Sequence, residues 1–338
     1  MTSFWRRFLM MLFLTTIAIA QSAPHLYKQV AKFEVGGDGG WDYINFDASS
    51  NRLFVGHSME ITVVDAASGK KIGSIPANGA HGAIAIPEKN LGFSTNGRAG
   101  TVTVFDLKTL QPKQDIKAGE NPDAIIYDQY SKKVIVMNGR SKDVMVIDPD
   151  SLKVVATVPL GGKLEAATSD PAHIYVNVED TGEIASVNSK TWKEDHRWKL
   201  TGCEEPSGMG IDEKKHRLFS VCGNKKMVVL DSTSGQILAM LETGAGTDGG
   251  GFDPDLGYAF ASNGADGSLT VVKSDKDKYA VAENVPTQRG ARTMAVDPNS
   301  HRVFLPTAEF GPPAEGQSRP SIKPGSFVIL VYAPTKSE

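Results

Sequence analysis

Cysteine, aromatic side chains and long apolar runs are all scarce in this chain of 338 residues. It has two cysteines and only 8% aromatic residues. Beyond the first twenty residues no apolar run is long enough to cross a bilayer, so we expect no stable membrane span in the rest of the chain. No window has the spacing of an amphipathic helix, which argues against a repeat that contains helices. Dense runs of Lys and Arg are missing as well, and nucleic acid is therefore not an expected partner.

The start of the chain has the features of a secretory signal peptide. Two arginines are followed by an apolar stretch, residues 8–17, and then by small residues that end at Ala20. We predict that residues 1–20 are removed and that residues 21–338 form a mature periplasmic or secreted protein.

An apolar strand that ends in an acidic residue recurs along the chain. The copies that carry an aspartate end at Asp47, Asp128, Asp170, Asp212, Asp253 and Asp297. Pro87 holds this place in the second copy, and successive copies lie 40 to 44 residues apart. Two further segments rich in β-branched and aromatic residues follow each copy, and a more polar segment completes each unit. The chain therefore reads as seven repeats of four short strands.

Repeats of this length and strand number predict an all-β fold, a seven-bladed β-propeller of four-stranded antiparallel blades in one domain. The last repeat lacks its fourth strand, because the chain ends soon after the third. A segment that begins at Lys28 resembles the fourth strand that begins at Lys153. We predict that residues 25–35 complete the seventh blade and close the ring without an open sheet edge.

Several short motifs resemble those of a known propeller family. The turn DAASG at Asp65 returns as DSTSG at Asp231. Other motifs are WDY, NPDA, NGRS, CEEPSG and GART, which begin at Trp41, Asn121, Asn138, Cys203 and Gly290. Together with the strand-Asp repeat, they make the mature chain resemble the YVTN-repeat, YncE-like propellers, in particular an exported bacterial branch without an assigned reaction. The resemblance implies the propeller fold and an exported location, and it adds little chemistry.

Polar residues stand where the innermost strand of each blade begins, and in a propeller these positions face one mouth of the central channel. Around the ring they are Asp42, His81, Asp123, Glu165, Glu205, Asp248 and Arg292. Three interpretations stay open: side chains solvated by channel water, ligands for a small molecule or divalent cation, and catalytic groups. His57, at the end of a second strand, is expected either to be an isolated exposed residue or to join His81 at the mouth.

Catalytic motifs such as a nucleophile elbow, a phosphate loop or a zinc-protease helix are missing, which favours a binding module without catalysis. Its expected partner at the channel mouth is a small molecule or an envelope protein. The alternative is a lactonase-like hydrolase or lyase, in which Glu165, Asp123 or Asp248 holds a calcium or magnesium ion and His81 acts as a base. That alternative depends on analogy with other propellers.

The two cysteines belong to one repeat. Cys203 lies in the loop that enters the fifth blade, and Cys222 ends the second strand of that blade. The intervening hairpin turns near Lys214, so the two sulfur atoms return to the same end of the blade. We predict a disulfide, because an exported protein meets an oxidising environment and the spacing is not that of a redox-active C-x-x-C pair.

A proline-rich insertion at residues 308–325 interrupts the seventh repeat. A loop longer than its six counterparts is a lid, a partner-binding excursion or a tolerated insertion. These readings also stay open.

Overall fold

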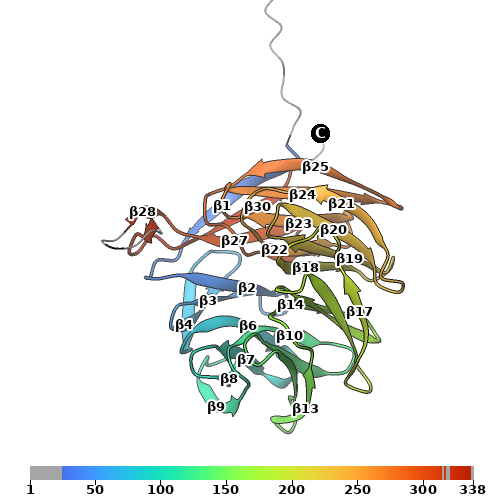
Figure 1. The fold of residues 1–338 in the computed structure, drawn as a ribbon. Helices are drawn as coiled ribbons and strands as arrows, with labels where there is room; N and C mark the ends of the chain where they lie inside the picture. Colours follow the sequence, from blue (N-terminus) through green and yellow to red (C-terminus); the bar gives the residue numbers. More distant parts are fainter. Residues whose placement is uncertain (1–24, 314–315, 317–319, 336–338) are drawn as a thin grey trace, which may run out of the picture.

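The computed structural model describes residues 25–313, 316 and 320–335, and most of them form β-strands. Seven four-stranded antiparallel sheets stand around a common axis as the blades of a propeller (Figure 1). This confirms the predicted all-β, seven-bladed fold. The helical element among the described residues is one 3₁₀ turn, η1 (Pro87–Lys89). The predicted signal segment, residues 1–20, lies outside the described residues.

In each of the first six blades the chain runs from the innermost to the outermost strand. The first three blades are β2 (Trp41–Asp47), β3 (Arg52–His57), β4 (Glu60–Asp65) and β5 (Lys71–Pro76); β6 (Ala80–Ile86), β7 (Leu91–Asn96), β8 (Thr101–Asp106) and β9 (Pro112–Lys117); and β10 (Pro122–Asp128), β11 (Lys133–Asn138), β12 (Asp143–Asp148) and β13 (Lys153–Pro159). The next three are β14 (Leu164–Ser169), β15 (His173–Val178), β16 (Glu183–Asn188) and β17 (Lys193–Lys199); β18 (Pro206–Asp212), β19 (Arg217–Cys222), β20 (Lys226–Asp231) and β21 (Ile237–Glu242); and β22 (Thr247–Asp253), β23 (Tyr258–Asn263), β24 (Ser268–Asp275) and β25 (Lys278–Pro286).

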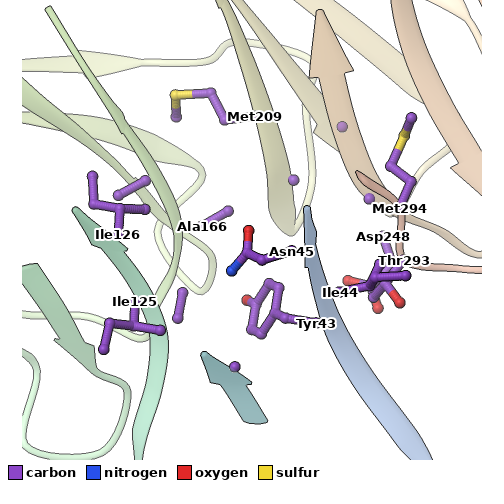
Figure 2. Close-up of a pocket in the computed structure, with 16 residues that line it drawn as sticks. Tyr43, Ile44, Asn45, Ile125, Ile126, Ala166, Met209, Asp248, Thr293 and Met294 are labelled. Atoms are coloured by element: carbon purple, nitrogen blue, oxygen red, sulfur yellow. The ribbon is translucent and has the colours of Figure 1, made fainter. Parts of the chain in front are cut away.

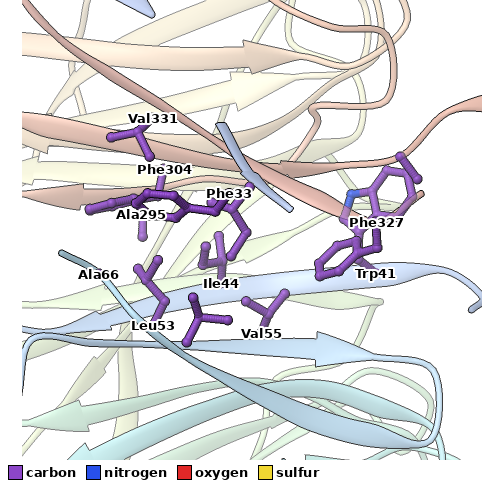
Figure 3. Close-up of a cluster of buried hydrophobic side chains, with 13 residues drawn as sticks. Phe33, Trp41, Ile44, Leu53, Val55, Ala66, Ala295, Phe304, Phe327 and Val331 are labelled. Carbon is purple, nitrogen blue, oxygen red and sulfur yellow. The ribbon is translucent and has the colours of Figure 1, made fainter. Parts of the chain in front are cut away.

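The seventh blade joins the two ends of the described chain. Its strands, from the inside outward, are β26 (Ala295–Asp297), β27 (Arg302–Thr307), β30 (Val328–Pro334) and β1 (Tyr27–Glu34). Strand β1 pairs antiparallel with β30 along its length, which confirms the predicted closure by the N-terminal strand. Phe33 and Trp41 then pack with Phe304 and Phe327 in a core between the seventh and first blades (Figure 3).

The glycine of the repeated turn motif has a packing role as well as a conformational one. Gly69 and Gly235 have φ values of +72° and +73°, which side chains larger than hydrogen disfavour. A Cβ atom at Gly69 would lie 2.2 Å from Cδ1 of Phe33, and one at Gly235 would lie 2.0 Å from Cδ1 of Trp198. In both cases an aromatic ring from the outermost strand of the preceding blade covers the glycine. The motif therefore marks a contact between blades.

Innermost strands of neighbouring blades approach each other closely around the axis. A Cβ atom at Gly208 in β18 would lie 2.1 Å from the backbone nitrogen of Gly250 in β22. The second strand of the first blade makes a similar approach, since a Cβ atom at Gly56 in β3 would lie 2.0 Å from the carbonyl oxygen of His81 in β6. Glycine at these positions lets the backbones of neighbouring blades pack directly against each other.

Cys203 and Cys222 form a disulfide within the fifth blade. Their Cα atoms are 5.4 Å apart, within the range that a disulfide spans without backbone distortion. This confirms the predicted pairing.

Within the insertion in the seventh repeat, β28 (Phe310–Pro313) and β29 (Pro320–Ile322) pair as antiparallel strands. The Phe310 ring lies 6.1 Å from the Trp41 ring, so these strands pack beside the joint between the seventh and first blades. Across the described ranges, the structure has no helix of the length and apolarity that a bilayer crossing requires.

Candidate functional site at the channel mouth

In six blades the second residue of the innermost strand lies at one end of the central channel. In six blades the first residue of the inner strand pairs with the last residue of the second strand, as Trp41 pairs with His57. The residues one position further along are Asp42, His81, Asp123, Glu165, Ser207 and Asp248, and Arg292 precedes the shorter strand of the seventh blade. All of these except His81 line one cavity of 230 Å³, and His81 bonds to two of them.

Glu205, the remaining residue of the sequence-based set, is not among the residues that line this cavity. It is exposed, with a φ of +50°, and holds the turn position that Asn121 occupies in the third blade with a φ of +53°. Each of these residues is followed by a proline and then by the residue at the mouth, Asp123 in one blade and Ser207 in the other. Aligning the two prolines identifies Ser207 from the sequence.

Buried polar side chains hold the backbone of the mouth residues in place. Thr95, Asn177 and Ser262, all on second strands, donate hydrogen bonds of 2.6, 2.8 and 2.5 Å to the carbonyl oxygens of Asp123, Ser207 and Arg292. Each bond runs from one blade to the next. The positions of the mouth residues are therefore set by the packing of neighbouring blades.

His81 is held between two carboxylates. Its Nδ1 lies 2.5 Å from Oδ2 of Asp42 and 3.3 Å from Oδ1 of Asp123. Burial lowers the pKa of His81, but the hydrogen bond to Asp42 and the charge of Asp123 outweigh it and raise the pKa to about 9. Burial raises the pKa of Asp123 to about 6, with the Asp42 charge adding to the effect and His81 opposing it. At neutral pH the imidazole is therefore a cation.

Arg292 connects this cluster to the other side of the mouth. Its guanidinium forms an ion pair with Asp248, lies 3.5 Å from Oδ1 of Asp42, and donates a 2.8 Å hydrogen bond to the carbonyl oxygen of Trp41. Burial raises the pKa of the Asp248 carboxyl, and Arg292 opposes that shift. Negative and positive side chains thus alternate in space across the mouth, in the order Asp248, Arg292, Asp42 and His81.

Glu165 faces a second group of charges. Its Oε1 lies 2.8 Å from Nζ of Lys163, and its Oε2 accepts a 3.1 Å hydrogen bond from the hydroxyl of Tyr43. Lys163 also forms an ion pair with Glu179. Burial, a hydrogen bond with Glu179 and the charge of Asp123 raise the pKa of Glu165 to about 8, against the opposing effect of Lys163. Glu165 is therefore mainly protonated at neutral pH.

Three further residues line the cavity, Tyr43, Lys163 and Glu179, and the position at the start of the innermost strand does not predict them. Tyr43 follows a mouth residue, and Lys163 lies two positions before Glu165. Glu179 directly follows the second strand of its blade, where the second and third blades have Gly97 and Gly139. A side chain at this position is aimed at the mouth, since a Cβ atom at Gly97 would lie 2.4 Å from Nε2 of His81. The sequence therefore carries a signal for Glu179, because a glutamate stands there in place of the glycine of the second and third repeats.

An apolar space adjoins the polar cavity along the channel. It has a volume of 130 Å³, and Figure 2 shows Ile125, Ile126, Ala166, Met209 and Met294 around it. Tyr43 and Asp248 line both spaces. The mouth thus offers charged groups outside and a small apolar recess within.

His57 takes no part in this site. It is 4% exposed, and its ring stacks on Phe327 with ring centres 4.2 Å apart. Burial lowers its pKa. Both expectations for His57 are therefore wrong, because the side chain is neither exposed nor beside His81. It packs in the joint between the seventh and first blades.

Asp42, His81 and Asp123 are also the mouth residues with a geometry that fits a metal ion. Their ligand atoms lie within 4.8 Å of one another. Two carboxylates and an imidazole suit a first-row transition ion better than calcium or magnesium, which prefer oxygen ligands. Because ligation requires a neutral imidazole, an ion would have to displace the proton that gives His81 its raised pKa.

Comparison with known proteins supports the architecture. No family model and no curated protein sequence matches the chain. Among solved structures, the chain is similar to hydrazine synthase of Kuenenia stuttgartiensis, with a TM-score of 0.66 and 16% sequence identity over 79% of this chain and 92% of that one. At this identity the likeness shows a shared fold, which is a β-propeller.

Proposed function

We propose that this protein is an exported binding module of the YVTN-repeat, YncE-like type that takes up a small polar molecule at the channel mouth. The observation that carries the proposal is the convergence of polar side chains from six blades, five of which contribute charged groups, on one cavity of 230 Å³. The interblade hydrogen bonds to the mouth backbone support a preorganised site. The disulfide fits the oxidising compartment that export would provide.

The charges favour a ligand with an organic ammonium group. At neutral pH Glu165 is mainly protonated, and the three cationic groups of His81, Lys163 and Arg292 face four carboxylates, those of Asp42, Asp123, Glu179 and Asp248. The carboxylate excess suits a cation that donates hydrogen bonds, while the recess beyond Tyr43 suits a short apolar part. The cavity is smaller than the roughly 300 Å³ at which pockets for drug-sized ligands begin, so the ligand is small.

Binding can be tested with a panel of small organic ammonium ions, first by thermal shift and then by calorimetry. A ligand should raise the melting temperature of the wild-type protein. Asp42→Asn should weaken its binding by about tenfold or more, which corresponds to about 1.4 kcal/mol, because the variant loses one charge facing the ligand.

Glu205→Gln is the matched control, since Glu205 is an exposed carboxylate that precedes a mouth position without lining the cavity. It should bind the ligand as the wild type does. Equal binding by all three proteins, or the lack of any stabilising ligand in the panel, would contradict the proposal.

A hydrolase or lyase reaction is the second candidate, and the raised pKa values of Glu165 and Asp123 favour it. A carboxylic acid that stays protonated near pH 7 is suited to general acid catalysis. His81, with a pKa of about 9, would serve there as a cation that stabilises developing negative charge, and the role of a base would require a lower pKa. Steady acid release from a lactone panel in a pH-stat, abolished by Glu165→Gln, would support this candidate over binding alone.

A further inference from the structure

A second group of potential metal ligands lies on the fourth blade, away from the channel mouth. His173 begins β15, and Asp195 and His196 are neighbours on β17. Strand β17, labelled in Figure 1, is the outermost strand of the same blade. The ligand atoms of the three residues lie within 4.8 Å of one another. We propose that these residues form a binding site for Zn²⁺ or a similar first-row transition ion.

A β-bulge brings two consecutive residues of β17 into this cluster. Ser186 pairs with His196 and Val187 pairs with Glu194, so Asp195 is the extra residue. In a regular strand neighbouring side chains point to opposite faces, whereas a bulge re-aims them. All six other blades have a bulge at the corresponding place, where the extra residues are Ile72, Lys113, Val155, Leu238, Ala282 and Val30. Only in the fourth of the seven blades does the bulge hold a carboxylate.

The distances suit a tetrahedral ion. Nε2 of His173 lies 3.1 Å from Oδ2 of Asp195. Ligand atoms around tetrahedral zinc are separated by roughly 3.3 Å, given bonds of about 2.0–2.1 Å to nitrogen and oxygen. Two imidazoles and one carboxylate are a donor set that favours zinc, nickel or copper over calcium and magnesium. A fourth position would remain for water.

Neighbouring polar groups are arranged to orient the ligands. Nδ1 of His173 lies 3.5 Å from the hydroxyl of Tyr175 and 3.7 Å from Oδ1 of Asp170. The Tyr175 hydroxyl in turn donates a 2.7 Å hydrogen bond to Asp170. A proton on Nδ1 would face these oxygens and leave the Nε2 lone pair free for a metal, which is the outer-shell arrangement common at histidine ligands.

Asn188 supports the carboxylate ligand in a similar way. Its Nδ2 donates a hydrogen bond of 3.5 Å to Oδ2 of Asp195. At the same point of the third strand, four other blades carry aspartate, namely Asp65, Asp106, Asp148 and Asp231. An aspartate at position 188 would repel Asp195, so the fourth blade departs from the repeat where a carboxylate ligand needs a donor.

Calorimetric titration of the full chain, made without a histidine tag, with zinc chloride tests the site. We expect one Zn²⁺ per chain that survives His81→Ala and is weakened in His196→Ala. The loss should be at least the roughly 10- to 100-fold that removal of an outer-shell partner costs. His196 is exposed, so its replacement leaves the core intact. Absence of Zn²⁺ binding, or binding lost in His81→Ala and retained in His196→Ala, would overturn the proposal.

Two further measurements separate a built site from a chance cluster. Tyr175→Phe should weaken Zn²⁺ binding by about tenfold, because it removes the group that faces Nδ1 of His173. The His196 ring stacks on the Trp198 ring with centres 5.6 Å apart, so Cu²⁺ bound here should quench the fluorescence of Trp198. Quenching should disappear in Trp198→Phe. Unchanged affinity in Tyr175→Phe together with unchanged quenching in Trp198→Phe would count against the site.

Discussion

Single residues at the channel mouth hold protons that the unfolded chain would release. The pKa rises from 3.8 to about 6 at Asp123, from 4.5 to about 8 at Glu165, and from 6.5 to about 9 at His81. Burial is the largest cause for the two carboxyl groups, and the flanking carboxylates outweigh burial for the imidazole. The mouth therefore keeps protons at neutral pH that limit its negative charge.

The pH dependence of stability follows from these shifts. Within each window the folded state binds more protons than the unfolded state, so the free energy of unfolding falls as pH rises. We expect the melting temperature to decrease between about pH 4 and pH 9 on account of these groups. Glu165→Gln should flatten the decrease between pH 4.5 and about pH 8, by at most about 1.4 kcal/mol per pH unit.

Thermal melts across this pH range, with Glu205→Gln as the control, check the assignment. The control should keep the wild-type slope, because Glu205 lies outside the cavity. A wild-type slope in Glu165→Gln would show that Glu165 titrates as an ordinary glutamate.

At the scale of one element, the fifth blade depends on its disulfide. The bond joins the loop before β18 to the end of β19, and both cysteines are buried. It closes a loop with a sequence separation of 19 residues. A loop of about this size loses roughly 3 kcal/mol of unfolded-state entropy on crosslinking. Replacing both cysteines by alanine should therefore lower the free energy of unfolding by about 3 kcal/mol.

Denaturant unfolding with and without reductant provides the internal control. The wild type should fall to the level of the double variant in reductant, and the variant itself should not respond. Equal stability of the two proteins under oxidising conditions would argue against a stabilising role for the bond.

At the scale of the whole molecule, the ring is held closed by strand β1. Tyr27 and Phe33 are buried, and Phe33 packs both in the core of Figure 3 and against Gly69 of the first blade. Phe33→Ala should lower the free energy of unfolding by about 3–5 kcal/mol, because it leaves a cavity at the closure of the ring. Denaturant titration followed by circular dichroism measures the change.

Val30 offers the matched control on the same strand, since it is 47% exposed. Val30→Ala should change stability by less than about 0.5 kcal/mol. A similar small effect for Phe33→Ala would mean that β1 contributes little to closure.

The amino-acid sequence by itself predicts the blade count, the closing strand and the disulfide. These features depend on local patterns: alternating apolar strands, turns that need glycine or aspartate, and hairpins that return a strand to its starting end. Such patterns repeat every 40 to 44 residues, so each copy reinforces the others. The same repeat also predicts most of the residues at the mouth, because they hold equivalent positions at the start of the innermost strands.

The protonation states at the mouth depend on contacts between strands and between blades. These contacts join residues that lie far apart in the sequence, so the repeat pattern does not predict them. The pKa of Glu165 depends on Glu179 and Asp123, which come from another strand and another blade. Side-chain direction and protonation are set by distances through space and by burial, and neither quantity exists until the ring has closed.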